Sequence, residues 1–145
     1  MKLIRPLFLV APLALSLLAA ETTLAAITEQ AVLTEGAPYT GNYGSALALS
    51  GDTLVVGRGG EEKAHVYVRS GNTWAQQAVL TASNSDPGDR FGDSVGISGD
   101  LIIVGALLER SNARGVNGDG TNNSQNDAGA AYIFKRSGTT WTQVA

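Results

Sequence analysis

Short apolar stretches alternate with glycine-rich turns from residue 46 to residue 145, and this spacing predicts β-strands rather than helices. The pattern occurs twice, because residues 43–57 align with residues 91–105 at a constant offset of 48. Further along, residues 66–74 align with residues 133–141 at an offset of 67, so the second copy carries 19 additional residues. An internal repeat of this kind predicts that one small supersecondary unit is built twice.

Each copy is expected to form four short strands joined by tight turns. The expected strands are residues 46–50, 53–56, 64–69 and 73–80 in the first copy, and residues 94–98, 101–104, 131–136 and 140–145 in the second. Gly51 and Gly99 predict two-residue type II′ hairpins, because glycine adopts a positive φ at the first turn position. The second strand of each copy is an unbroken apolar run, which predicts burial on both faces. The fourth strand is more polar, as suits the edge of a sheet.

The composition agrees with a folded all-β protein. Of the 145 residues, 43% are hydrophobic and 16% are charged. Glycine occurs at 18 positions, which suits a fold with many tight turns. The net charge of -3 and the absence of a basic cluster argue against nucleic-acid binding, which needs grouped Lys and Arg to neutralise phosphates. Because the chain has no cysteine, it has no disulfide, no thiolate metal site and no cysteine nucleophile.

The N-terminus has the pattern of a signal peptide. A basic start with Lys2 and Arg5 is followed by an apolar run over residues 7–20 and then by small residues. We place the signal peptide at residues 1–25, with cleavage after residue 19 or 20 as alternatives and a short membrane anchor as the competing interpretation. The leader predicts a secreted, periplasmic or cell-surface protein without a membrane segment after cleavage.

The motifs of the second copy resemble a known repeat family. Phe91-Gly92, Ser98-Gly99-Asp100, Val104-Gly105-Ala106 and residues 129–134 are similar to the FG-GAP repeat of the bacterial, integrin-alpha-like kind. The first copy departs from the motif, with Tyr43 in place of Phe and Arg58 after Gly57.

This resemblance implies a partial β-propeller made of two four-stranded antiparallel blades. The first blade would span residues 31–82, with a preceding strand at residues 31–34, and the second would span residues 83–145 and be truncated at the C-terminus. Two blades do not close a ring, since propellers typically have 4–8. We therefore expect a fragment of a larger propeller, with assembly of several chains into one ring as the alternative. The open blade edges and faces of such a fragment favour self-association in isolation.

The resemblance also implies a binding or adhesive role for an exported protein. We expect a non-catalytic module whose loops bind a protein or a glycan, and the alternative is the non-catalytic portion of a secreted hydrolase. The match of residues 92–96 to G-x-S-x-G does not predict a nucleophile, because Ser94 lies in a strand-hairpin context and aligns with Ala46. His65 is the only histidine and aligns with Tyr132, so we expect it to pack rather than to catalyse.

The 19-residue insertion is the candidate functional loop. It is rich in Asn, Asp and Gly, and Asn117 and Asp119 are weak candidates for calcium ligation, because calcium prefers several oxygen ligands. The competing interpretation is a solvated loop, and no metal or cofactor is assigned.

Two further acidic groups are candidates of lesser weight. Asp86, Asp89 and Asp93 surround a Pro-Gly turn but have no acidic counterparts in the first copy, so the repeat does not support a shared metal site. Glu61 and Glu62 lie in the shorter loop of the first copy, and we expect them to be solvated.

Overall fold

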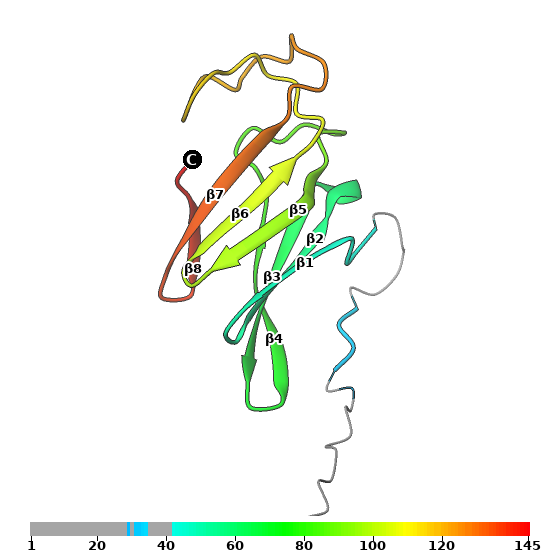
Figure 1. Cartoon of the computed structure of the whole chain (residues 1–145), viewed down its shortest axis with the longest axis vertical. Helices are drawn as coiled ribbons and strands as arrows, with labels where there is room; N and C mark the ends of the chain where they lie inside the picture. The colour runs from blue at the N-terminus through cyan, green and yellow to red at the C-terminus, as the bar shows by residue number, and fades with distance from the viewer. Residues whose placement is uncertain (1–28, 30, 35–41) are drawn as a thin grey trace, which may run out of the picture.

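The computed structural model describes Glu29, residues 31–34 and residues 42–145, so the predicted signal peptide lies outside the described residues. Residues 42–145 form two four-stranded antiparallel sheets, which confirms the all-β fold (Figure 1). The first sheet consists of β1 (Ala46–Ser50), β2 (Thr53–Arg58), β3 (Lys63–Ser70) and β4 (Thr73–Leu80), with a 3-10 turn η1 at Gly59–Glu61. The second consists of β5 (Phe91–Ser98), β6 (Leu101–Ala106), β7 (Ala130–Ser137) and β8 (Thr140–Gln143). Strands follow chain order in each sheet, so β4 and β8 lie at edges, as expected.

Tight hairpins join the strands at one end of the molecule. Ser50 pairs with Thr53 and Ser98 pairs with Leu101, which leaves two residues in each turn. Gly51 and Gly99 have φ values of 57° and 55°, as the predicted turn type requires. The longer connections all lie at the opposite end, at the top of Figure 1.

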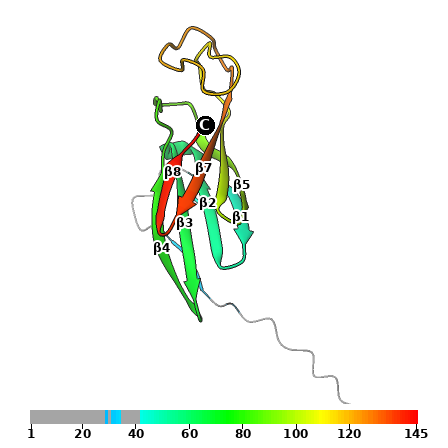
Figure 2. The same cartoon turned by 90° about the vertical axis from the view of Figure 1, so that its left-hand side faces the viewer.

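The two sheets stack face to face, and the apolar core lies between them (Figures 1 and 2). β5 of the second sheet packs across β1 and β2 of the first. The core cluster joins side chains from both sheets, and its members include Val55, Val66, Leu80, Phe91, Ile102, Val104 and Phe134. The burial of these side chains is the main stabilising term in a fold of this kind.

The sheets stack in the same orientation rather than as mirror images. Ile102 and Val104 of β6 face the first sheet, but their counterparts at an offset of 48, Leu54 and Val56, lie on the face of β2 that points away from the second sheet. Residues on the inner face of the first sheet therefore correspond to residues on the outer face of the second. The arrangement repeats in one direction, like successive blades of a propeller.

This directionality corrects one prediction about the second strands. β2 is buried on both faces, as expected, but β6 alternates between buried and exposed positions. The second sheet covers one side of β2, and Tyr43 packs on His65 beside Val56 on the other side. In the described part of the chain, no element covers the outer face of β6, so Leu101 and Ile103 remain exposed.

The expected strand at residues 31–34 is also not formed. These residues are described and have no strand pairing. Their repeat counterparts, residues 78–81, lie beside β3, with which Ala78 and Leu80 pair. A strand needs such a neighbour to satisfy its main-chain donors and acceptors, and no described strand precedes residues 31–34.

Each sheet contains the same three-membered aromatic group. Tyr43 packs edge-on against His65 at 5.5 Å between ring centres, and its hydroxyl donates to the hydroxyl of Tyr67 at 2.7 Å. In the second copy, Phe91 packs edge-on against Tyr132 at 5.5 Å and against Phe134 at 6.0 Å. The aligned residues thus make equivalent contacts within their own sheets, which confirms the repeat in three dimensions.

The main chains of the two sheets lie close together at two glycines. A Cβ atom added at Gly57 would overlap the carbonyl oxygen of Gly92, and one added at Gly92 would overlap the carbonyl oxygen of Lys63. Gly92 also has a φ of 101°, which side-chain-bearing residues rarely adopt. Because the opposing atoms belong to the main chain, neither can rotate away.

We predict that Gly57→Ala lowers the free energy of unfolding by about 1–3 kcal/mol, because the added methyl group forces the sheets apart. Gly105→Ala is the matched control, since Gly105 occupies the same repeat position and its added methyl group would meet only the side chain of exposed Ser94. The control should cost less than about 1 kcal/mol in urea denaturation. Equal losses in the two variants would contradict this account of the sheet contact.

Candidate functional site

Three loops meet at the end of the molecule opposite the hairpins. They connect β2 to β3, β4 to β5, and β6 to β7, and the last contains the 19-residue insertion (Figure 1). The main-chain N–H of Leu108 donates to the carbonyl oxygen of Asp89 at 3.0 Å and joins two of these loops. The insertion is closed on itself by bonds from the N–H of Gln125 to Arg110 and from the N–H of Gly129 to Glu109, both at 2.9 Å.

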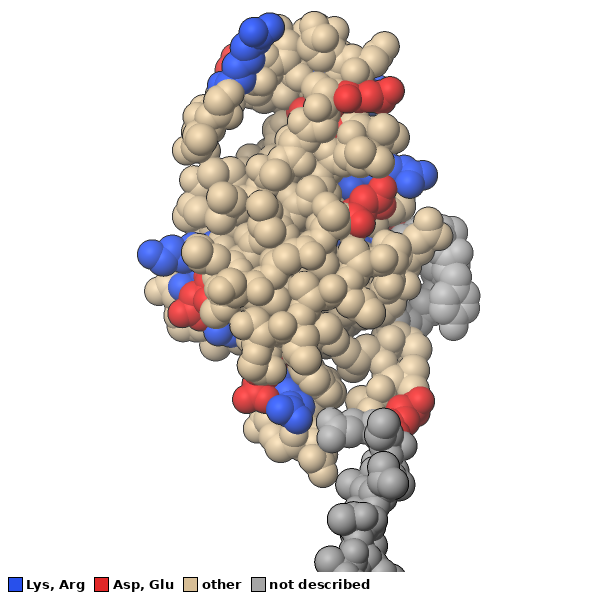
Figure 3. Space-filling model, viewed as in Figure 1, with Lys and Arg blue, Asp and Glu red and all other residues tan. Residues whose placement is uncertain are grey.

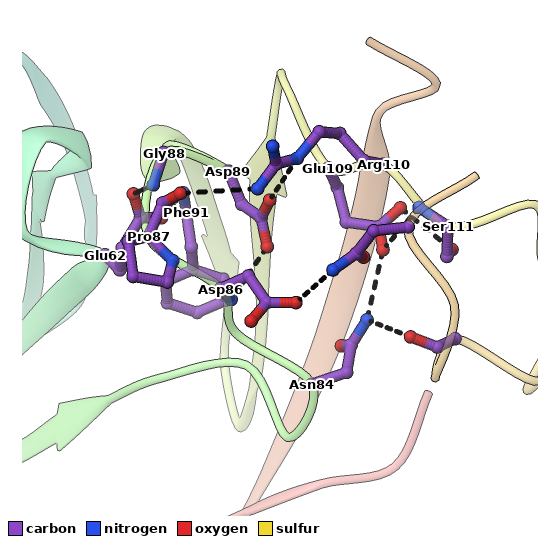
Figure 4. Close-up of polar contacts among 12 residues, drawn as sticks. Glu62, Asn84, Asp86, Pro87, Gly88, Asp89, Phe91, Glu109, Arg110 and Ser111 are labelled. Atoms are coloured by element: carbon purple, nitrogen blue, oxygen red, sulfur yellow. Dashed lines mark hydrogen bonds and ion pairs between the residues drawn. The ribbon is translucent and has the colours of Figure 1, made fainter. Parts of the chain in front are cut away.

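A buried carboxylate anchors the insertion. Glu109 is only 2% exposed, and its carboxylate accepts the N–H of Ser111 at 3.1 Å and the hydroxyl of Ser111 at 3.0 Å. It also accepts the side-chain amide of Asn84, from the β4–β5 loop, at 3.1 Å (Figure 4). A buried charge needs several donors to replace water, so these bonds fix the path of the chain where the insertion begins.

Asn84 connects this anchor to the second sheet. Its amide nitrogen also donates to the carbonyl oxygen of Gly120 at 3.2 Å, and its carbonyl oxygen accepts the hydroxyl of Tyr132 at 2.9 Å. Burial, with a smaller contribution from the charge of Glu109, raises the pKa of Tyr132 to about 12. The Tyr132 hydroxyl therefore keeps its proton and orients Asn84 for the two bonds that hold the loop.

The predicted acidic group around the Pro-Gly turn does not converge. Asp89 accepts the N–H of Asp86 at 2.9 Å and lies 3.8 Å from Arg110, while Asp86 accepts the amide of Asn123 at 2.7 Å (Figure 4). Asp93 pairs instead with Arg90 at 3.2 Å. Within residues 42–145, no three acidic or histidine side chains gather as metal ligands would.

The weak calcium candidates lie in the insertion, beside a cavity. Asp119 accepts the N–H and the hydroxyl of Thr121 at 3.0 and 2.6 Å, and these bonds lower the pKa of its carboxyl group. A cavity of about 460 Å³ lies between the insertion and the ends of β7 and β8. We call it the loop-end cavity, and its lining includes Asn84, Glu109, Asn117, Asp119, Tyr132 and Gln143. Figure 3 shows the loop arching over an opening at this end.

The other predicted candidates lie away from this cavity. Ser94 is exposed within β5, so its surroundings are a strand and not the turn that a nucleophile elbow requires. His65 is buried in β3 of the first sheet, where its Nδ1 lies 3.1 Å from the side-chain oxygen of Gln76. Burial lowers the pKa of His65, with smaller lowering contributions from Arg58 and Lys63, opposed by the bond to Gln76 and by the charge of Glu61.

The sequence did not predict the structural role of three side chains that organise this end, Glu62, Asn84 and Glu109. Glu62, expected to be solvated, accepts the N–H groups of Gly88 at 3.1 Å and Phe91 at 2.7 Å, so it joins the first sheet to the start of the second. Glu61, the other acid of this loop, pairs with the buried Arg58 at 2.6 Å and remains partly exposed. Asn84 and Glu109 carry no local motif, because their partners are distant along the chain.

The stacked, same-facing sheets define a class of protein, an all-β repeat protein of the β-propeller type. Residues 74–134 match the family model described as FG-GAP repeat, so this part of the chain carries an FG-GAP repeat. The matched segment begins in β4 and ends in β7, so the family's unit straddles the two sheets. No curated protein matches the chain. Within the described residues, no helix has the length and apolar character to cross a membrane.

We predict that Glu109→Ala loosens the insertion, because Ser111 and Asn84 lose their buried acceptor at a cost of about 1–3 kcal/mol. Amide hydrogen exchange in residues 107–129 should become about tenfold faster or more, and trypsin should cut faster after Arg110 and Arg114. The control is Gln125→Ala, at an exposed residue that joins the loop through its main-chain N–H. Unchanged exchange in Glu109→Ala would show that the carboxylate does not anchor the loop.

We also predict a pH-dependent contribution to stability from His65. Because its pKa is lower in the folded chain than its ordinary value of 6.5, the unfolded chain binds the proton more tightly. The contribution of neutral His65 to the free energy of unfolding is fully present above about pH 6.5. Between that pH and the lowered pKa, it decreases by about 1.4 kcal/mol for each pH unit. His65→Tyr, which copies the residue at the aligned position, should remove this decrease in urea denaturation between pH 7 and the lowered pKa. Parallel curves for the two proteins would contradict the assignment.

Proposed function

We propose that this FG-GAP repeat protein is an exported, non-catalytic binding module whose loop-end cavity takes a hydroxyl-rich ligand such as a glycan. The observation that carries the proposal is the cavity itself, which is concave and has carboxylate, amide and main-chain groups in its lining. Such groups bind hydroxyls by accepting and donating hydrogen bonds at once. Binding sites commonly lie on loops that a rigid sheet scaffold positions.

The structure of the insertion supports a binding role over that of a loose connection. Its first residues are fixed by Glu109, and Gly120 is held by Asn84. Asn122 donates to Asn112 at 2.7 Å, and Asn123 donates to Asp86 at 2.7 Å. A loop held in this way loses less conformational entropy when a ligand binds, which favours affinity.

The non-catalytic part of the proposal rests on where the reactive side chains lie. Ser94 and His65 belong to different sheets. The candidate acids Asp86, Asp89 and Asp93 accept hydrogen bonds from loop donors or pair with an arginine. The proposal of export rests on the leader over residues 1–25. Adhesion to a cell surface or a matrix is the role that fits both a non-catalytic module and an exported protein.

The test is calorimetric titration of the purified chain with a panel of neutral and acidic oligosaccharides. We expect binding to at least one class, weakened about tenfold or more by Asp119→Ala, because a hydrogen bond to a charged group contributes about 1.5–3 kcal/mol. Asn117→Ala should weaken binding by about two- to tenfold, because a hydrogen bond to a neutral amide contributes about 0.5–1.5 kcal/mol. Asn72→Ala is the control, in the turn between β3 and β4 at the opposite end (Figure 1). Absence of binding, or binding that both cavity variants leave unchanged, would reject this function.

Calcium is tested in the same experiment. We expect about 1 mM calcium to leave the melting temperature and the saccharide affinity unchanged, because residues 42–145 gather no group of three acidic or histidine side chains. If calcium raises the melting temperature by several degrees and Asp119→Ala abolishes that rise, the insertion is a calcium loop.

A further inference from the structure

The two outward-facing sheet surfaces of this chain are copies of the two sides of its internal interface. The surface of the second sheet that faces away from the first carries Leu101, Ile103, Gly105 and Ile133, and we call it the trailing face. The surface of the first sheet that faces away from the second carries Tyr43, Leu47, Leu49 and Val79, and we call it the leading face. Both faces follow from the one-directional stacking of the sheets.

The trailing face corresponds to the inner face of the first sheet. Ile103 and Ile133 are 48% and 36% exposed, whereas their repeat counterparts, Val55 and Val66, are 0% exposed beneath the second sheet. An apolar hollow of about 350 Å³ on the trailing face is lined mainly by isoleucine, leucine and glycine. Figure 3 shows a broad area free of charge over β5–β7, the strands nearest the viewer in Figure 1.

The leading face corresponds to the inner face of the second sheet. Leu47 and Leu49 are each 63% exposed, whereas their counterparts, Val95 and Ile97, are partly buried against the core. The aromatic group of Tyr43 lies on this face, where the equivalent group of Phe91 packs into the core of the stacked sheets. The leading face therefore carries the equivalents of the apolar residues that pack on the first sheet at the internal interface.

The residues that make close contacts at the internal interface have exposed equivalents on both outer faces. The N–H of Gly99 donates to the hydroxyl of Ser50 at 3.1 Å between the two sheets. The same pair at the next interface would be Gly51 of one copy and Ser98 of another, and both residues are exposed. Gly105 occupies the position of Gly57, where the absence of a side chain admits the main chain of the neighbouring sheet.

We infer that the trailing face of one chain docks onto the leading face of a second copy of the same chain, in the manner of the internal interface. The contact is heterologous, since it joins two different surfaces of identical molecules. Such contacts form rings when the rotation closes and filaments when it does not.

The test uses one variant on each face. Ile103→Asp places a charge on the trailing face and Leu49→Asp places one on the leading face, both at exposed positions where the monomer should still fold. Sedimentation velocity over about 1–100 µM should show association of the wild-type chain and at least a tenfold loss of association for each variant alone. Leu101→Asp and Leu47→Asp are the second variants on the same two faces, and circular dichroism with thermal melting checks that each protein is folded.

Mixing the two variants separates this geometry from others. Leu49→Asp retains an intact trailing face and Ile103→Asp retains an intact leading face, so an equimolar mixture should form a 1:1 complex that grows no further. A wild-type chain that stays monomeric, or a mixture that stays monomeric, would overturn the inference. So would association that persists in each single variant, because it would arise from a two-fold contact, from the leader or from another surface.

Discussion

The close approach of two main chains at Gly57 and Gly92 is the constraint on which the rest of this structure depends. Side-chain-bearing residues there would separate the sheets, and the core between them would lose its packing. With the sheets in contact, Phe91 is fully buried and the donors of Gly88 and Phe91 reach the carboxylate of Glu62. The position of the second sheet, and of every loop that it carries, follows from this contact.

Buried or partly buried carboxylates have the same task in both copies. Glu62 joins the short loop of the first sheet to the entry of β5, and Glu109 joins the insertion to Asn84 and Ser111. In each case an acceptor satisfies main-chain or side-chain donors that the turn would otherwise leave unpaired. The loop end is consequently ordered by these two acids.

Stacking in one direction explains both the stability of the pair and its exposed surfaces. A sandwich that packs two equivalent faces together hides its apolar sides, whereas a repeat stacked in one direction leaves one copy of each side uncovered unless it closes into a ring. Residues at the same repeat position can therefore be buried in one sheet and exposed in the other, as Val55 and Ile103 are. The uncovered faces are a consequence of the fold and not a separate feature of the sequence.

The sequence by itself determined the repeat, the strands, the glycine turns and the FG-GAP resemblance, because these depend on residues close together along the chain or on direct comparison of two segments. It also predicted that His65 packs within the fold, and His65 is buried against Tyr43. Only the tertiary structure decided which face of each sheet is buried, why β6 is half exposed, and that Glu62, Asn84 and Glu109 organise the loops. Those outcomes depend on contacts between residues about 25 or more positions apart, such as Asn84 with Glu109, and local spacing carries no signal for them.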